Sequence, residues 1–96
     1  MPKKISRTSE EGASFLRALG HPTRLQILQI LLEEDQCVKN IWERLGLSQA
    51  NVSQHLTMMK HQGILKAERK GGRMCYSIKD KRAIQILDLL RFSSRA

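Results

Sequence analysis

The sequence lacks the segments that would carry a protein into or across a membrane. It contains no run of 18 apolar residues, so no transmembrane helix is expected. Its first residues, MPKKISRTSEEGASF, include basic side chains but no apolar core of a signal peptide. We therefore expect a cytoplasmic protein that has no membrane partner.

Cysteine is also scarce, with only Cys37 and Cys75 in the chain. Without a signal peptide, so few cysteines are typical of a reducing compartment, and we expect free thiols. None of the three histidines, His21, His55 and His61, has a cysteine or histidine partner at zinc-finger spacing. His21 is instead expected to shape the start of the helix that follows it.

Motifs of catalysis are missing as well. The sequence shows no nucleophile–base arrangement, no phosphate-binding loop and no paired carboxylates. We expect no enzyme activity. A winged-helix module for protein interactions would be expected to lack the basic and polar features described below.

Positive charge is abundant and unevenly placed. The chain carries a net charge of +8 over 96 residues. Residues 49–96 hold ten lysines and arginines against three acids, whereas residues 1–48 hold seven against six. A surface of this charge attracts polyanions such as nucleic acid. The alternative is a basic surface that serves only solubility.

The apolar spacing predicts a mainly α protein with a small β-hairpin. Pro22 suits a first helical turn, and Ser9, Ser48 and Asp80 suit helix N-caps. Residues 1–96 are expected to form one domain, with frayed ends at about residues 1–7 and 93–96. The elements are expected at about residues 9–19, 22–33, 38–45, 49–62, 66–70, 73–78 and from 81 onward.

The segment from Ile41 to Tyr76 predicts a winged helix-turn-helix. A short helix leads into a turn at Gly46, and a second helix follows whose inward side chains are expected to be Val52, Leu56 and Met59. Two basic strands then meet at Gly71-Gly72. Such an order places the second helix in the major groove of double-stranded DNA.

The predicted second helix exposes side chains that read base edges. Glutamine and asparagine pair with adenine, and serine or threonine contacts several bases. Phosphate contacts are expected from the helix ends and from the basic hairpin. The alternative is a polar helix face that meets only water. The expected DNA-binding residues are Ser48, Gln49, Ala50, Asn51, Ser53, Gln54, Thr57, Lys60, Arg69, Lys70 and Arg73.

The first and last helices carry more apolar residues than one small core needs, which favours a homodimer. The alternative is packing of both stripes within one chain. The expected interface residues are Phe15, Leu16, Leu19, Ile84, Leu87 and Leu90.

Two motifs, LRALGHPTRLQILQIL and LGLSQANVSQHLTMMKHQGIL, closely resemble the ArsR/SmtB family of bacterial repressors. The resemblance covers about Phe15 to Asp80. It implies a homodimeric winged helix-turn-helix repressor that dimerises through its first and last helices. It also implies an inducer that lowers DNA affinity, often a metal ion, a metalloid or a thiol-reactive species.

The family metal sites are not preserved in this chain. The thiolate site of arsenic- and cadmium-responsive members resembles ELCVCDL, and the matching stretch here is DQCVKNI. Cys37 matches the first thiolate, but Lys39 replaces the second, and an ammonium group repels cations. The family zinc site on the last helix needs histidine, which is absent beside Asp80 and Asp88.

Cys37 and Cys75 therefore leave three interpretations open. They lie close together if the segment before the third helix pairs with the second hairpin strand. They then form a redox or persulfide switch, bind a thiophilic metal or metalloid with a third ligand, or serve only as small packed residues. A constitutive DNA-binding protein without an inducer is the alternative to an inducible repressor.

Overall fold

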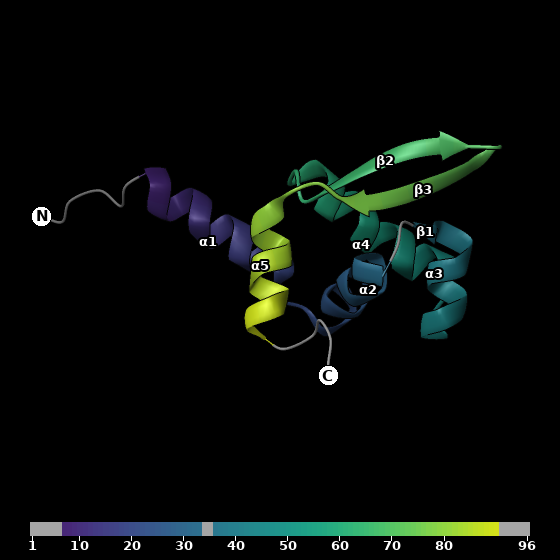
Figure 1. Ribbon diagram of the computed structural model, residues 1–96, viewed down its shortest axis with the longest axis horizontal. Coiled ribbons are helices and arrows are strands. Elements are labelled where there is room, and N and C mark those ends of the chain that lie inside the picture. The colour runs from purple at the N-terminus through teal and green to yellow at the C-terminus, as the bar shows by residue number, and fades with distance from the viewer. Residues whose placement is uncertain (1–6, 34–35, 91–96) are drawn as a thin grey trace, which may run out of the picture.

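The computed structural model describes residues 7–33 and 36–90. Within these ranges, the helices pack against a small sheet. The hairpin of this sheet extends away from the helical body (Figure 1). The elements are α1 Arg7–Leu19, α2 Pro22–Glu33, β1 Gln36–Cys37, α3 Val38–Leu45, α4 Gln49–His61, β2 Leu65–Lys70, β3 Arg73–Ile78 and α5 Lys81–Leu89. The predicted mainly α winged helix-turn-helix is confirmed. The predicted frayed ends lie outside the described residues, apart from Arg7 at the start of α1.

Local hydrogen bonds begin and end the helices of the helix-turn-helix. The Ser48 hydroxyl accepts a hydrogen bond of 3.1 Å from the Asn51 backbone N–H, which caps α4 as predicted. Gly46 ends α3 at φ 68°, a conformation that glycine adopts without steric cost. The predicted cap at Ser9 is wrong, because α1 already begins at Arg7.

The core lies around α2, which contacts α1, α3, α4, α5 and β3. This central position explains why apolar residues surround much of α2 rather than forming one narrow stripe. Val52, Leu56 and Met59 of α4 are fully buried, as the sequence predicts. Every helix within the described ranges is too short or too polar to span a bilayer.

The sheet has the antiparallel order β1-β3-β2. Gly71 and Gly72 join β2 to β3 with φ of 56° and 81°, which suits the tight turn of a hairpin. We call β2, β3 and this turn the wing. β1 pairs with the other edge of β3 and places Cys37 opposite Cys75. The wing is thereby attached to the start of α3.

The six side chains predicted for the dimer interface divide into two groups by their burial within the protomer. Phe15, Leu19 and Leu87 expose at most 7% of their surface, because the protomer's own core covers them. The Arg82 guanidinium also lies 4.2 Å from the centre of the Phe15 ring. The other three predicted side chains remain 40–56% exposed, namely Leu16, Ile84 and Leu90.

Candidate nucleic-acid interface

The outward face of α4 presents the polar side chains that the sequence assigns to base reading. Ser53 is half-buried, and the other assigned residues of this helix are exposed. A shallow hollow runs along this face beside Ala50, Gln54 and Thr57. The face is available to a partner because the apolar side of α4 is turned into the core.

The wing carries the exposed cations Arg69, Lys70 and Arg73. Lys70 Nζ lies 3.8 Å from Glu68 Oε1, an exposed pair that contributes little stability. Arg69 and Arg73 form no ion pair within the described part of the chain. Their charge is therefore free to meet an anionic partner.

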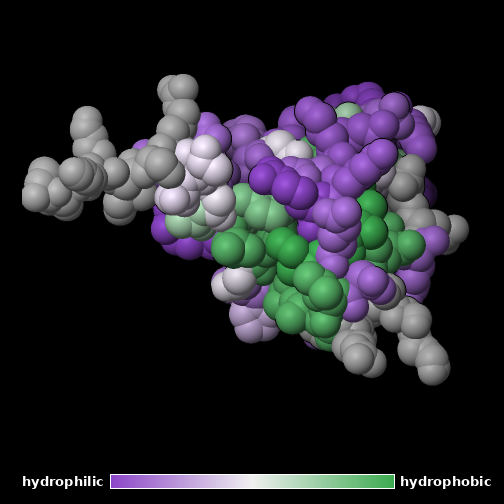
Figure 2. All heavy atoms as spheres, turned by 60° about the vertical axis from the view of Figure 1, so that its left-hand side comes forward, coloured by the Kyte–Doolittle hydropathy of each residue, from purple (hydrophilic) through white to green (hydrophobic). Residues whose placement is uncertain are grey.

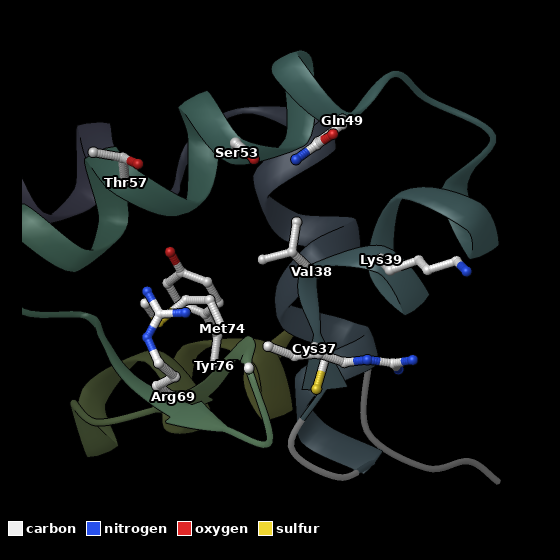
Figure 3. A pocket seen from close by; sticks show the side chains of 11 residues that line it. Cys37, Val38, Lys39, Gln49, Ser53, Thr57, Arg69, Met74 and Tyr76 are labelled. Atoms are coloured by element: carbon white, nitrogen blue, oxygen red, sulfur yellow. The ribbon is translucent and has the colours of Figure 1, made fainter.

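A cleft of about 460 Å³ separates α4 from the wing. Gln49, Ser53 and Thr57 line it from α4, and strands and the start of α3 close the other side (Figure 3). Its cations are Lys39, Arg69 and Arg73, and none of its described lining residues is acidic. We call it the α4–wing cleft.

Sequence reasoning missed two features of this cleft, Lys39 and Tyr76. Lys39 joins the cleft because β1 pairs with β3, a contact between segments that are distant in the sequence. Tyr76 joins it through strand alternation, which places Met74 and Tyr76 on one face of β3. The register Arg69↔Met74 adds Arg69 to the same face, so alternation together with register identifies these residues.

Tyr76 is the only tyrosine of the chain, and its residue surface is 8% exposed. Burial raises the pKa of its hydroxyl, so the group remains a neutral hydrogen-bond donor near neutral pH. The hydroxyl points toward α4 (Figure 3). It makes no hydrogen bond to the part of the chain that the structure describes.

Cys37 and Cys75 form a disulfide between β1 and β3. Their Cα atoms lie 3.8 Å apart, which confirms that the two residues are close. The expected free thiols are not present, because the register brings both sulfurs together and this form is oxidised. The sulfur of Cys37 points away from α4 (Figure 3), although Cys37 belongs to the lining of the α4–wing cleft.

The described residues offer no group of three or more histidine, cysteine, aspartate or glutamate side chains that could hold a metal ion. In the disulfide form, the two sulfurs also present no thiolate to a metal. The structure therefore supplies no additional ligand for the thiophilic metal or metalloid site considered from the sequence.

A polar junction connects α4 to α1 and α2. Arg24 donates one hydrogen bond of 3.0 Å to His55 Nδ1 and another of 3.0 Å to the Ala18 carbonyl. The His21 and His55 rings lie 4.5 Å apart. Burial lowers the pKa of His55, and the neighbouring His21 and Arg24 lower it further. His21 Nδ1 accepts a hydrogen bond of 3.0 Å from the Thr23 backbone, so it shapes the start of α2 as predicted.

Comparisons with known proteins agree with this architecture. Residues 21–67 match the family model described as "Bacterial regulatory protein, arsR family". An HTH-type transcriptional regulator of Methanocaldococcus jannaschii, MJ1325, is 39% identical over 84% of this chain and 92% of its own. A probable mercury resistance operon repressor of Streptomyces lividans is 38% identical over 82% of this chain and 63% of its own. These relatives are transcription regulators and not enzymes.

Solved structures show the same fold. HlyU from Vibrio cholerae superposes with a TM-score of 0.84 at 28% identity, covering 91% of this chain and 95% of its own. A reduced form of HlyU superposes with a TM-score of 0.83. The homodimeric winged helix-turn-helix DNA-binding domain Mb0332 from Mycobacterium bovis gives 0.79 at 27% identity, covering 94% of this chain and 86% of its own.

Proposed function

The chain belongs to the ArsR family of bacterial regulatory proteins, and from this premise we propose that it is a homodimeric repressor controlled by thiol oxidation. It is a transcriptional regulator with a DNA-binding winged helix-turn-helix. In the proposal, the reduced dimer binds operator DNA, and formation of the Cys37–Cys75 disulfide releases it.

The proposed DNA surface consists of the outward face of α4 and the wing. In the major groove, α4 presents amides and hydroxyls to base edges, with the Ala50 methyl near a thymine methyl group. Lysine and arginine side chains neutralise phosphates on both sides of the groove. The residues proposed for this surface are Ser48, Gln49, Ala50, Asn51, Ser53, Gln54, Thr57, Lys60, Arg69, Lys70 and Arg73.

The proposed dimer surface is an apolar patch on α1 and α5. Its exposed members are Leu16, Ile84, Leu89 and Leu90, which we call the α1–α5 patch. Figure 2 shows apolar side chains gathered on this side of the molecule. Contiguous apolar surface of this kind is typical of an interface, and the Mb0332 domain is itself homodimeric. A C2 dimer presents two copies of α4 to successive turns of DNA.

The main support for the proposed control of DNA affinity by oxidation is the position of the disulfide. It links β1, which leads directly into α3, to the central strand of the wing. A covalent bond there restricts how the wing moves relative to the helix-turn-helix. Because DNA must contact α4 and the wing together, a change in their relative position changes affinity.

The chemical step balances with a peroxide as the oxidant. One thiolate attacks the peroxide, takes up one oxygen as a sulfenic acid and releases water or an alcohol. The second thiol then displaces water from that sulfenic sulfur to form the disulfide.

The test is DNA binding to the promoter of the protein's own operon, measured by fluorescence anisotropy on reduced and peroxide-treated protein. We expect oxidised wild type to bind at least about tenfold more weakly, a change of about 1.4 kcal/mol. Cys37→Ser and Cys75→Ser should bind equally with and without peroxide. Equal affinity of reduced and oxidised wild type would instead indicate a constitutive DNA-binding protein. Loss of binding on adding cadmium to reduced wild type would favour the metal interpretation.

A further inference from the structure

The α4–wing cleft is lined by a tyrosine whose hydroxyl has no hydrogen-bond partner among the residues that the structure describes. Tyr76 lies at the wall of the cleft, is more than nine-tenths buried, and points its hydroxyl toward α4 (Figure 3). It forms no hydrogen bond within the described ranges 7–33 and 36–90. A buried donor without an acceptor costs free energy, so the site favours a molecule that supplies an acceptor.

The charged side chains around this hydroxyl favour a molecule that carries negative charge. Arg69 lies on the same face of the wing as Tyr76, because the register pairs Arg69 with Met74 and Tyr76 follows Met74 by two residues. Lys39 and Arg73 line the cleft as well, and none of its described lining residues is acidic. A carboxylate meets both requirements, since it accepts a hydrogen bond and carries negative charge.

The remaining wall of the cleft is polar on the α4 side, where Gln49, Ser53 and Thr57 lie, and apolar at Val38 and Met74. Val38 and Met74 are half-buried and both line it. A volume of about 460 Å³ lies within the range of small-molecule sites, which combine apolar walls with a few placed polar groups. A DNA phosphate explains the cations at the rim, but it carries no apolar group to cover Val38 and Met74.

We infer that the α4–wing cleft binds a small organic monocarboxylate with an apolar body. Its carboxylate accepts the Tyr76 hydrogen bond and pairs with Arg69, and its body lies against Met74 and Val38. Because Gln49, Ser53 and Thr57 also line the cleft, the bound acid occupies space beside the proposed DNA-reading face and competes with DNA. This inducing role rests on the proposed DNA-binding function, whereas binding of the acid does not.

Cys37 belongs to the lining of the α4–wing cleft, next to Val38, whereas Cys75 does not. The Cys37 sulfur points away from α4 (Figure 3), and Cys75 alternates away from Tyr76 along β3. A carboxylate should therefore act equally on reduced wild type and on Cys75→Ser. The experiments below use reduced protein.

The first arm measures binding without DNA by NMR. The ring signals of the single tyrosine and the methyl signal of Met74 report on the cleft. We expect saturable shifts of both with benzoate and hexanoate, and at least about tenfold weaker binding of acetate, benzamide and inorganic phosphate. Equal binding of inorganic phosphate and benzoate would overturn the proposal, because it would reveal only a general anion site. Absence of any shift would overturn it too.

Two variants test whether Tyr76 and Arg69 bind the carboxylate of benzoate. The methyl signal of Met74 reports binding in each variant. Tyr76→Phe removes only the hydroxyl, and Arg69→Gln removes the charge while keeping a polar side chain. Each should weaken benzoate binding about fivefold or more. Lys66→Gln is the matched control, because it removes a cation from the same strand outside the cleft lining. An equal loss in Lys66→Gln would show that only overall charge matters and would overturn the assignment.

The second arm adds benzoate to the protein–DNA complex at constant ionic strength. Wild type should release DNA as benzoate fills the cleft, and Tyr76→Phe should bind DNA normally but need about fivefold more benzoate for release. If benzoate binds but DNA stays bound, the inducing role is wrong. If the protein binds no DNA even without benzoate, the proposed function fails, while the NMR arm still decides whether the cleft binds carboxylates.

Discussion

The face formed by α4 and the wing differs from the face formed by α1 and α5 in charge, polarity and relief. The first presents amides, hydroxyls and the cations Arg69 and Arg73 around a cleft. The second presents the side chains of the α1–α5 patch, of which Leu89 is 79% exposed (Figure 2). One small core supports both faces, so the fold alone does not determine what each face binds.

This difference in polarity indicates whether a partner covers each face permanently or only under some conditions. Polar and charged side chains are well hydrated, so the α4–wing face can remain free until its proposed DNA partner binds. Exposed leucine and isoleucine side chains gain free energy whenever they are buried, at roughly 25 cal/mol per Å². We therefore expect the α1–α5 patch to be covered permanently by a second copy and the α4–wing face to be covered conditionally.

The largest expected effect comes from salt, which should act on one face only. For a dimer that neutralises about six phosphates, DNA affinity should fall roughly a thousandfold between 50 and 200 mM salt. Dimerisation through apolar side chains should hardly change over the same range. Fluorescence anisotropy measures the first quantity and sedimentation equilibrium the second. DNA affinity that does not change with salt concentration would show that the two faces do not differ in their electrostatic contribution to binding.

The next effect separates the core of α5 from its exposed patch. Leu87→Ala should lower the free energy of unfolding by about 3 kcal/mol, because Leu87 is fully buried and the truncation leaves a cavity. Leu90→Ala, at the C-cap of this helix, should lower it less, because Leu90 is 48% exposed in the protomer and is covered only by the proposed second copy. Urea unfolding at one fixed protein concentration measures both. Equal losses would mean that the dimer buries Leu90 as deeply as the protomer buries Leu87.

Much of this fold follows from local signals in the sequence. The Ser48 cap, the Gly46 turn and the Gly71-Gly72 hairpin each depend on a few adjacent residues. Such signals specify where elements begin and end without knowledge of distant contacts. The winged helix-turn-helix and the outward face of α4 could therefore be predicted.

Other features of the structure could not be predicted, because they depend on contacts between residues that are far apart in the sequence. Phe15 and Leu16 are adjacent apolar residues of one helix, yet only Leu16 is exposed, because Phe15 packs into the protomer's core and its ring also contacts Arg82 of distant α5. The partner of Cys37 lies 38 residues away, and pairing depends on the β1–β3 register. The oxidation state of the two sulfurs depends on the surroundings of the protein as well as on its sequence. The α4–wing cleft likewise joins residues from five elements, β1, α3, α4, β2 and β3.

A smaller effect is expected from one added charge on the α1–α5 patch. Ile84→Glu should weaken the dimer roughly 30-fold, because a carboxylate at an apolar interface loses hydration without gaining a partner. Gln85→Glu is the matched control, since it adds the same charge to the adjacent exposed position. Sedimentation equilibrium gives both dissociation constants, and circular dichroism checks that both variants fold. An equal effect of the two substitutions would show that Ile84 does not lie in the interface.

The smallest effect concerns the junction that connects the two faces, where Arg24 joins α4 to the end of α1. Arg24 donates to His55 Nδ1, so His55 accepts this bond only in its neutral form. The folded protein holds the His55 pKa below its ordinary value of 6.5, chiefly through burial and further through His21 and Arg24. The unfolded chain therefore binds this proton more tightly, and the free energy of unfolding should fall as the pH decreases below 6.5. Urea unfolding at pH 7.5 and 5.5 should show this loss in wild type and a smaller loss in His55→Gln, whose amide oxygen accepts from Arg24 at both pH values. Identical pH dependence in the two proteins would mean that the junction does not sense protons and that the two faces are coupled only through the apolar core.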